Sequence, residues 1–210
     1  MEMEKMRYLP IILFVLTILQ ISPTFATDSM NLSSEDREQF TEIFFDWKKD
    51  QIAQLNYMEA KDCNPAFYLD NFIKDKYHPD VYLGFPKKTE AIIPIYANSD
   101  DTLDFVVTFR AKQCDGGSAM AGFQEKILFL STNNGHLADS DFLSDNIQES
   151  PLPLSWASHY LAGSTGDTKL TGKAILTLRG DSRCCPSLKS YFTFDFKTGK
   201  TAFEKPVENY

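Results

Sequence analysis

The sequence is short of metal-binding residues and of long apolar segments. It has 3 histidines in 210 residues, and His78, His136 and His159 stand far apart, with no cysteine or second histidine at the spacing of metal ligands. Beyond residue 26, no apolar run reaches the roughly 20 residues that a membrane-spanning helix needs. Internal repeats and low-complexity tracts are also absent. We therefore expect no metal, no other cofactor and no membrane association of the mature chain.

The N-terminal residues have the pattern of a secretory signal. An apolar run of about 13 residues follows Lys5 and Arg7 and leads to Thr24-Phe25-Ala26, with small residues where a signal peptidase cleaves. No cysteine follows this region, so the lipid anchor of a bacterial lipoprotein is not expected. We predict a signal peptide over residues 1–26 and one domain over residues 27–210, periplasmic or secreted. A retained N-terminal anchor is the alternative.

The chain is acidic, with 29 Asp and Glu against 21 Lys and Arg and a net charge of −8 at pH 7. Residues 1–26 carry both signs equally, so the mature chain keeps this charge. Such a charge repels nucleic acid and anionic membranes, which argues against both as partners, and it attracts a basic protein. The alternative is that the charge only keeps an exported protein soluble.

All four cysteines, Cys63, Cys114, Cys184 and Cys185, follow the predicted signal and so enter an oxidising compartment. We expect two disulfides. A bond between Cys184 and Cys185 requires a strained ring across one peptide bond, so Cys63 and Cys114 are each expected to reach one member of the pair. A redox site would need two residues between the thiols, and a metal site would need further soft ligands, so the pair is interpreted as structural.

An amphipathic helix is predicted near the start of the mature chain. Ser33 or Ser34 can cap a helix with an acidic first turn. Apolar side chains then recur at helical spacing as far as about residue 58, and these are Phe40, Phe44, Trp47, Leu55 and Met58. Glu42, Asp46 and Asp50 fall on the polar side, which favours a solvated face.

The remaining residues predict a second helix over residues 65–75 and then strands. From residue 81 the apolar period changes to two, which predicts strands over residues 81–85, 90–97, 103–113, 123–132, 172–179, 190–197 and 201–205. Turns are expected at Asn133-Asn134-Gly135 and Thr198-Gly199-Lys200. Residues 135–171 form a long irregular stretch, for which we expect either a functional loop or a loop that contains a short helix. The expected fold class is α+β, with N-terminal helices packed on a mainly antiparallel β-sheet.

A weak calcium site is one candidate. Oxygen-bearing side chains occupy every second position from 98 to 104, namely Asn98, Asp100, Thr102 and Asp104. This is the rhythm of a calcium loop, but the central glycine and the closing glutamate of such a loop are missing. A polar hairpin between two strands is therefore the favoured interpretation.

Two further candidates concern a catalytic serine and a ligand pocket. Ala162-Gly163-Ser164-Thr165-Gly166 is similar to the elbow that holds a hydrolase serine, with His159 nearby in sequence. A flexible loop has the same composition, and no apolar strand before it or helix after it is evident. A small-ligand carrier is another possibility, with aromatics such as Phe40, Phe44 and Trp47 lining a pocket between helix and sheet. A filled aromatic core explains those residues equally well.

Three segments together resemble a known group of exported bacterial proteins. They are Asp101-Thr102-Leu103-Asp104-Phe105-Val106-Val107, Gly116-Gly117-Ser118, and Asp181-Ser182-Arg183-Cys184-Cys185-Pro186-Ser187. The order of these segments is similar to that in the group of the LppP and LprE lipoproteins, over roughly residues 90–196. The resemblance implies a bacterial periplasmic or cell-surface setting and names no catalytic residue.

The sequence thus favours a secreted or periplasmic binding protein without catalytic activity. One concrete hypothesis is an inhibitor or immunity-type protein that holds a basic exported enzyme or toxin, because an acidic face speeds association with a basic partner. The alternatives are a serine hydrolase that uses Ser164 and a small-ligand carrier.

Overall fold

The computed structural model describes residues 31–59, 63, 83–84, 89–98, 100–110, 112–113, 124–148, 150–153, 155–182 and 185–209. These residues contain the helices α1 (Ser34–Ala53) and α3 (Phe142–Asn146). The strands of the first half are β1 (Leu83–Gly84), β2 (Ala91–Ile95), β3 (Asp104–Arg110), β4 (Lys112–Gln113), β5 (Gln124–Thr132) and β6 (Gly135–Asp139). The second half forms β7 (Ser155–Thr165), β8 (Lys169–Leu178), β9 (Leu188–Asp195), β10 (Lys200–Phe203) and β11 (Val207–Glu208).

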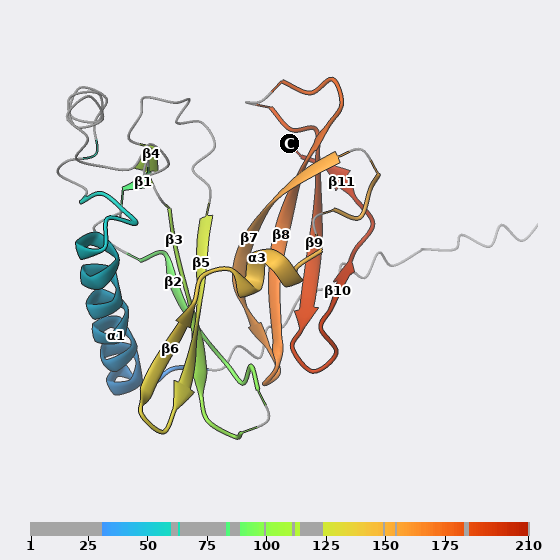
Figure 1. Ribbon diagram of the computed structural model, residues 1–210. Coiled ribbons are helices and arrows are strands. Elements are labelled where there is room, and N and C mark those ends of the chain that lie inside the picture. Colours follow the sequence, from blue (N-terminus) through green and yellow to red (C-terminus); the bar gives the residue numbers. More distant parts are fainter. Residues whose placement is uncertain are drawn as a thin grey trace, which may run out of the picture.

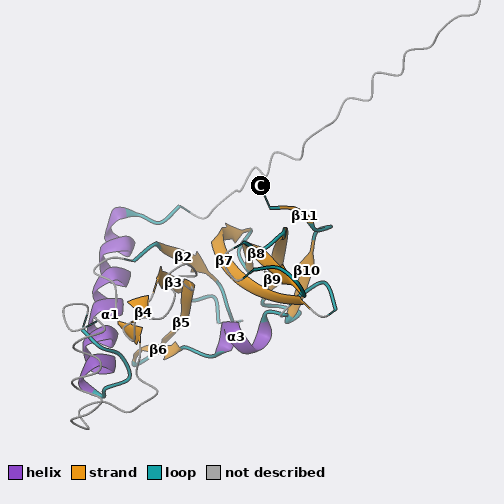
Figure 2. Ribbon diagram, turned by 90° about the horizontal axis from the view of Figure 1, so that it is seen from above, coloured by secondary structure: helices purple, strands orange, loops and turns teal. Residues whose placement is uncertain are grey.

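The described elements form three layers (Figure 1). A four-stranded antiparallel sheet of order β2-β3-β5-β6 lies in the middle. Helix α1 covers one face of it, and the second sheet, of order β10-β9-β8-β7 with β11 paired to β9, covers the other (Figure 2). The short α3 connects the two sheets in sequence. Strands β1 and β4 pair with each other in a small separate ribbon.

Helix α1 forms where the sequence predicts it but ends earlier. The Ser33 hydroxyl accepts a hydrogen bond from the Asp36 backbone N–H at 3.0 Å, which caps the N-terminus as expected. Phe40 and Phe44 are buried against the middle sheet. The helix stops at residue 53 because the chain turns at Leu55, whose φ is 62°. Leu55 is consequently 43% exposed and not part of the buried stripe.

The middle sheet buries side chains on both faces. Phe105, Val107 and Phe109 of β3 pack toward α1, whereas Val106 packs toward the second sheet. Every residue of β3 except the last is buried. A strand between two apolar layers needs apolar side chains on both of its faces, and Phe105, Val106 and Val107 supply them.

The second sheet presents one face to the core and one to solvent. Leu170, Ala174 and Leu176 of β8 alternate with less buried residues and join the core between the sheets. Phe192 and Phe194 of β9 do the same. The expected turns are confirmed, with φ of 120° at Gly135 and 63° at Gly199.

The expected α+β class with two disulfides is wrong. The described chain is mostly strand, arranged in two antiparallel sheets with one long helix, and not N-terminal helices on a single sheet. The largest error concerns residues 135–171, which contain β6, the short α3 and the 11-residue strand β7. A short helix was one of the two alternatives expected for this stretch, and the two strands were not predicted. The predicted helix over residues 65–75 lies outside the described residues.

Strand β7 was not predicted because its two faces do not differ in polarity. Its inward positions include a histidine and its outward positions include Trp156 and Tyr160. A register shift between Leu161 and Gly163 breaks the period further. Pairing with β8 along ten residue pairs, and not amphipathicity, specifies this strand. Among the described residues, no helix is long and apolar enough to cross a membrane.

Gly172 should be required by packing in the second sheet. A Cβ there would lie 2.5 Å from the Tyr160 backbone oxygen and 2.7 Å from the Phe192 ring. We expect Gly172→Ala to destabilise the protein by about 1–3 kcal/mol, measured by urea unfolding. The matched control is Gly163→Ala in the neighbouring strand, where nothing lies within 4 Å of the added Cβ. Equal effects of the two variants would contradict this account.

Candidate functional site

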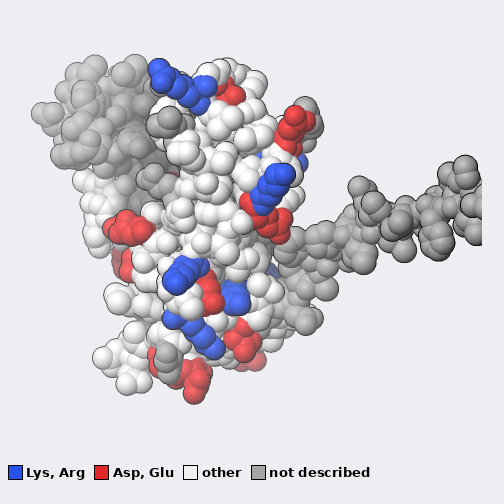
Figure 3. Space-filling view, turned by 90° about the vertical axis from the view of Figure 1, so that its right-hand side faces the viewer, with Lys and Arg blue, Asp and Glu red and all other residues white. Residues whose placement is uncertain are grey.

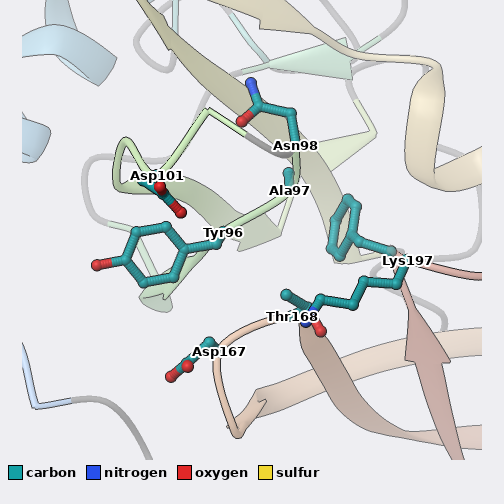
Figure 4. A pocket seen from close by; sticks show the side chains of 8 residues that line it. Tyr96, Ala97, Asn98, Asp101, Asp167, Thr168 and Lys197 are labelled. Atoms are coloured by element: carbon teal, nitrogen blue, oxygen red, sulfur yellow. The ribbon is translucent and has the colours of Figure 1, made fainter.

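A polar cleft lies where the ends of both sheets meet (Figure 4). It has a volume of about 720 Å³ and is lined by the residues after β2, the β7–β8 turn and the residues after β9. Backbone hydrogen bonds join its walls, from Tyr96 N–H to the Asp167 carbonyl at 2.8 Å and from Phe196 N–H to the Thr168 carbonyl at 3.0 Å. Figure 4 shows Asp101 and Asp167 on either side of Tyr96, while Lys197 extends toward Thr168.

Asn98, one of the four candidate calcium ligands, lines this cleft, and hydrogen bonds within the protein engage all four. Asp104 is buried, and its carboxylate accepts from the backbone N–H groups of Ala97 at 2.9 Å and Ser131 at 2.8 Å. Burial raises the pKa of this carboxyl, although both hydrogen bonds oppose the increase. Asp100 accepts from the Asn98 amide and the Thr102 backbone N–H at 3.0 and 2.9 Å. These contacts form the polar hairpin that the sequence favoured.

Ser164 lies within β7 and not at a strand-to-helix corner. Its side chain is 1% exposed, and its hydroxyl has no hydrogen-bond partner among the described residues. His159 lies in the same strand, where its ring packs on Phe192 with centroids 5.2 Å apart. A hydrolase serine must be open to substrate and in reach of its base. The described residues offer Ser164 neither condition.

The aromatic residues of α1 fill the space against the middle sheet. The rings of Phe40 and Phe105 stack at 4.1 Å, and those of Phe105 and Phe129 stack at 4.7 Å. Phe44 contacts Phe109 with centroids 5.6 Å apart. These contacts favour the filled core over a carrier pocket at this position.

A polar network between the two sheets was not predicted. The Gln124 side chain accepts from the Leu161 backbone N–H at 2.7 Å, at the register shift of β7, and donates to Glu90 at 2.9 Å. Glu90 also pairs with Arg110 at 2.6 Å. The network therefore supplies a partner to a backbone group at the register shift of β7, and it connects the two sheets.

Lys126 lies beside this network, on the face of β5 that points toward the second sheet. Its ammonium donates to the carbonyls of Gln124 at 3.3 Å and His159 at 3.4 Å. Burial lowers the pKa of Lys126, and the adjacent Glu125 partly offsets the decrease. The position of Lys126 could have been predicted from the sequence. It lies two residues from Leu128 on the same strand, so both side chains are on the face that packs toward the second sheet.

The two-disulfide prediction fails at Cys185, whose thiol is free and exposed. Cys63 is buried and disulfide-bonded, and no disulfide joins two described cysteines. Cys114 and Cys184 lie outside the described residues. With Cys185 free, four cysteines can form at most one disulfide.

The comparisons with known proteins identify no relative of this chain. No family model matches it, and neither a curated protein nor a solved structure does so. The similarity to the LppP and LprE group therefore stays a prediction from the three sequence segments.

Thiol counting should confirm the state of the cysteines. We expect at least two reactive thiols in the unreduced, denatured protein, because a free Cys185 leaves at most one disulfide. Cys185→Ser should remove one thiol from the count obtained on the folded protein. A chromogenic thiol reagent measures both. A chain with no reactive thiol after denaturation would contradict the structure.

His159 should make the protein sensitive to acid. Burial, helped by the charge of Lys126, lowers the pKa of His159 from 6.5 to about 4, although a hydrogen bond to the Gln148 backbone raises it. The unfolded chain therefore binds a proton at higher pH than the folded chain, and stability falls as the pH drops from about 7 to about 4. His159→Phe should show a smaller decrease in urea-unfolding free energy over that range. Parallel pH profiles would refute the assignment.

Proposed function

We propose that this protein is a secreted or periplasmic binding protein without catalytic activity, and that it holds a basic protein partner on α1. The observation that carries the proposal is an acidic stripe on the exposed side of this helix. It consists of Glu35, Glu38, Glu42, Asp46 and Asp50, all exposed. The predicted signal peptide and the resemblance to exported bacterial proteins support the compartment.

The acidic stripe faces away from the core, and Lys49 is the basic residue that lies within it. Its positions fall within about 120° around the helix axis, since each residue turns by about 100°, and they extend over about 22 Å. Phe40 and Phe44 lie on the opposite side of the helix and are buried. Packing against the sheet therefore presents the whole stripe to solvent.

Helix stability does not explain this charge pattern. Glu42 has an acidic residue four positions before it and another four positions after it, and like charges at this spacing destabilise a helix by about 0.2–0.5 kcal/mol per pair. Asp50 lies near the C-terminal end, where the helix dipole disfavours a negative charge and the last turn contains no basic residue. Lys49 pairs with Asp46 at 2.7 Å, and this pair is exposed. A basic partner would relieve the repulsion.

The other side of the molecule is a poorer surface for a basic partner. Figure 3 looks at the side of the second sheet, where both charge signs are scattered among uncharged residues. Lys169 and Asp195 form an ion pair there at 3.8 Å. An acidic surface on one side and a mixed one on the other would orient a basic protein toward α1 during association.

Burial of Ser164 and the filled aromatic core weaken the two alternatives. A serine hydrolase requires a nucleophile that substrate can reach, and Ser164 is 1% exposed. A carrier with a pocket behind α1 requires space that the stacked rings occupy. Binding through a surface needs neither feature.

Charge reversal in the stripe tests the proposal. A basic cell-wall hydrolase serves as the probe, and its association rate with the immobilised protein is measured at low and high salt. Glu42→Lys should slow association severalfold at low salt and raise the melting temperature, because the substitution replaces two repulsions by two attractions. The difference in rate should shrink at high salt.

Glu208→Lys is the matched control, since Glu208 is exposed on β11 in the second sheet. It makes the same change in net charge and should slow association less than Glu42→Lys. Equal effects of the two variants would show that net charge alone acts. Failure of the probe and of basic proteins in an exported fraction to bind at low salt would overturn the proposal.

A further inference from the structure

The polar cleft of Figure 4 contains charged side chains of both signs. The charged residues that line it are Asp101, Asp167 and Lys197. All three are exposed, so a ligand in the cleft can reach their charged groups. Among the described residues, no hydrogen bond or ion pair engages these three side chains. The cleft thus offers two carboxylates and one ammonium to a ligand.

Nearby carboxylates outside the cleft lining have partners within the protein. Asp100 and Asp104 each accept hydrogen bonds from backbone N–H groups. Asp195 also accepts from a backbone N–H, at 2.9 Å, and forms an ion pair with Lys169 at 3.8 Å. These three carboxylates therefore have structural roles, whereas the two carboxylates of the cleft are available to a ligand.

The cleft has one position for a cation and another for an anion. Asp101 and Asp167 lie on either side of Tyr96, and Lys197 extends toward Thr168 (Figure 4). A cation on the Tyr96 ring would therefore meet an aromatic face and two negative charges. A carboxylate beside Lys197 would meet its ammonium and the Thr168 hydroxyl. Backbone hydrogen bonds join the walls of the cleft, so the fold holds the two positions next to each other.

We propose that this cleft binds an arginine with a free carboxylate, either the amino acid itself or the C-terminal residue of a peptide. Its guanidinium lies on the Tyr96 ring between Asp101 and Asp167. Its carboxylate contacts Lys197 and Thr168. A guanidinium suits the first position because it is planar, stacks on aromatic rings and pairs with carboxylates. A water takes up about 30 Å³, so a cleft of about 720 Å³ holds an amino acid with room for solvent.

L-Arginine is the probe, its binding is measured by isothermal titration calorimetry, and citrulline and agmatine are its matched comparisons. Citrulline replaces the guanidinium by a neutral group of the same shape, and agmatine lacks the carboxylate. L-Arginine should bind saturably and roughly five- to tenfold more tightly than either. Attraction of cations by the acidic chain alone would instead favour agmatine, which has the larger positive charge. Whichever of L-arginine and glycyl-arginine binds more tightly identifies the ligand as the amino acid or a peptide C-terminus.

Variants assign the two positions. Lys197→Met should weaken L-arginine binding roughly fivefold and should not weaken agmatine binding, whereas Lys200→Met, outside the cleft lining, should leave L-arginine binding unchanged. Asp101→Asn and Asp167→Asn should each weaken the binding of both L-arginine and agmatine, and Asp145→Asn in α3 is their control. Asparagine also tolerates the φ of 57° at Asp101. Melting curves confirm that each variant is folded.

Three results would overturn the proposal. They are no saturable binding of L-arginine or glycyl-arginine, an affinity for agmatine or citrulline equal to that for L-arginine, and unchanged L-arginine affinity in Lys197→Met. The first would show that the charged groups of the cleft are only solvated, and the others that the cleft does not read both ends of the ligand. None of them bears on the binding of a basic protein to α1, so the two proposals fail independently.

Discussion

The middle sheet has apolar layers on both of its faces, and the rest of the structure follows from this constraint. Strand β3 cannot leave a side to solvent, so all of its residues except Arg110 are buried, the polar Asp104 and Thr108 included. Helix α1 and the second sheet each need only one apolar face, which they place against it. Their other faces are free to carry charge or aromatic groups. The acidic stripe on α1 is therefore compatible with folding.

Polar groups between the two sheets arise from the same packing. Strand β7 pairs with β8 with a register shift between Leu161 and Gly163, and the backbone N–H of Leu161 bonds to the Gln124 side chain of the middle sheet. Lys126 lies two residues further along the same face of β5, where the edge of the apolar core opens into a cavity. A charged side chain in this position is costly unless a ligand or water compensates it.

Prediction from the sequence succeeded where the spacing of apolar residues and the capping and turn residues indicate the same element. The Ser33 cap, the buried faces at Phe40 and Phe44 and the turn at Gly199 are encoded within a few residues. It failed for β7, because long-range pairing with β8 forms that strand despite its mixed polarity. It also failed for the expected disulfides, since spacing in sequence does not say whether two thiols meet.

The sequence by itself determined the acidity of the chain, the amphipathic first helix, most strands of the two sheets and the polar hairpin around Asp104. These properties depend on residue type and local period. The tertiary structure alone decided that Ser164 is buried, that Cys185 is free and that Lys126 and His159 line one cavity. Lys126 and His159 come from strands of different sheets, and only the packing of those sheets brings the two residues together.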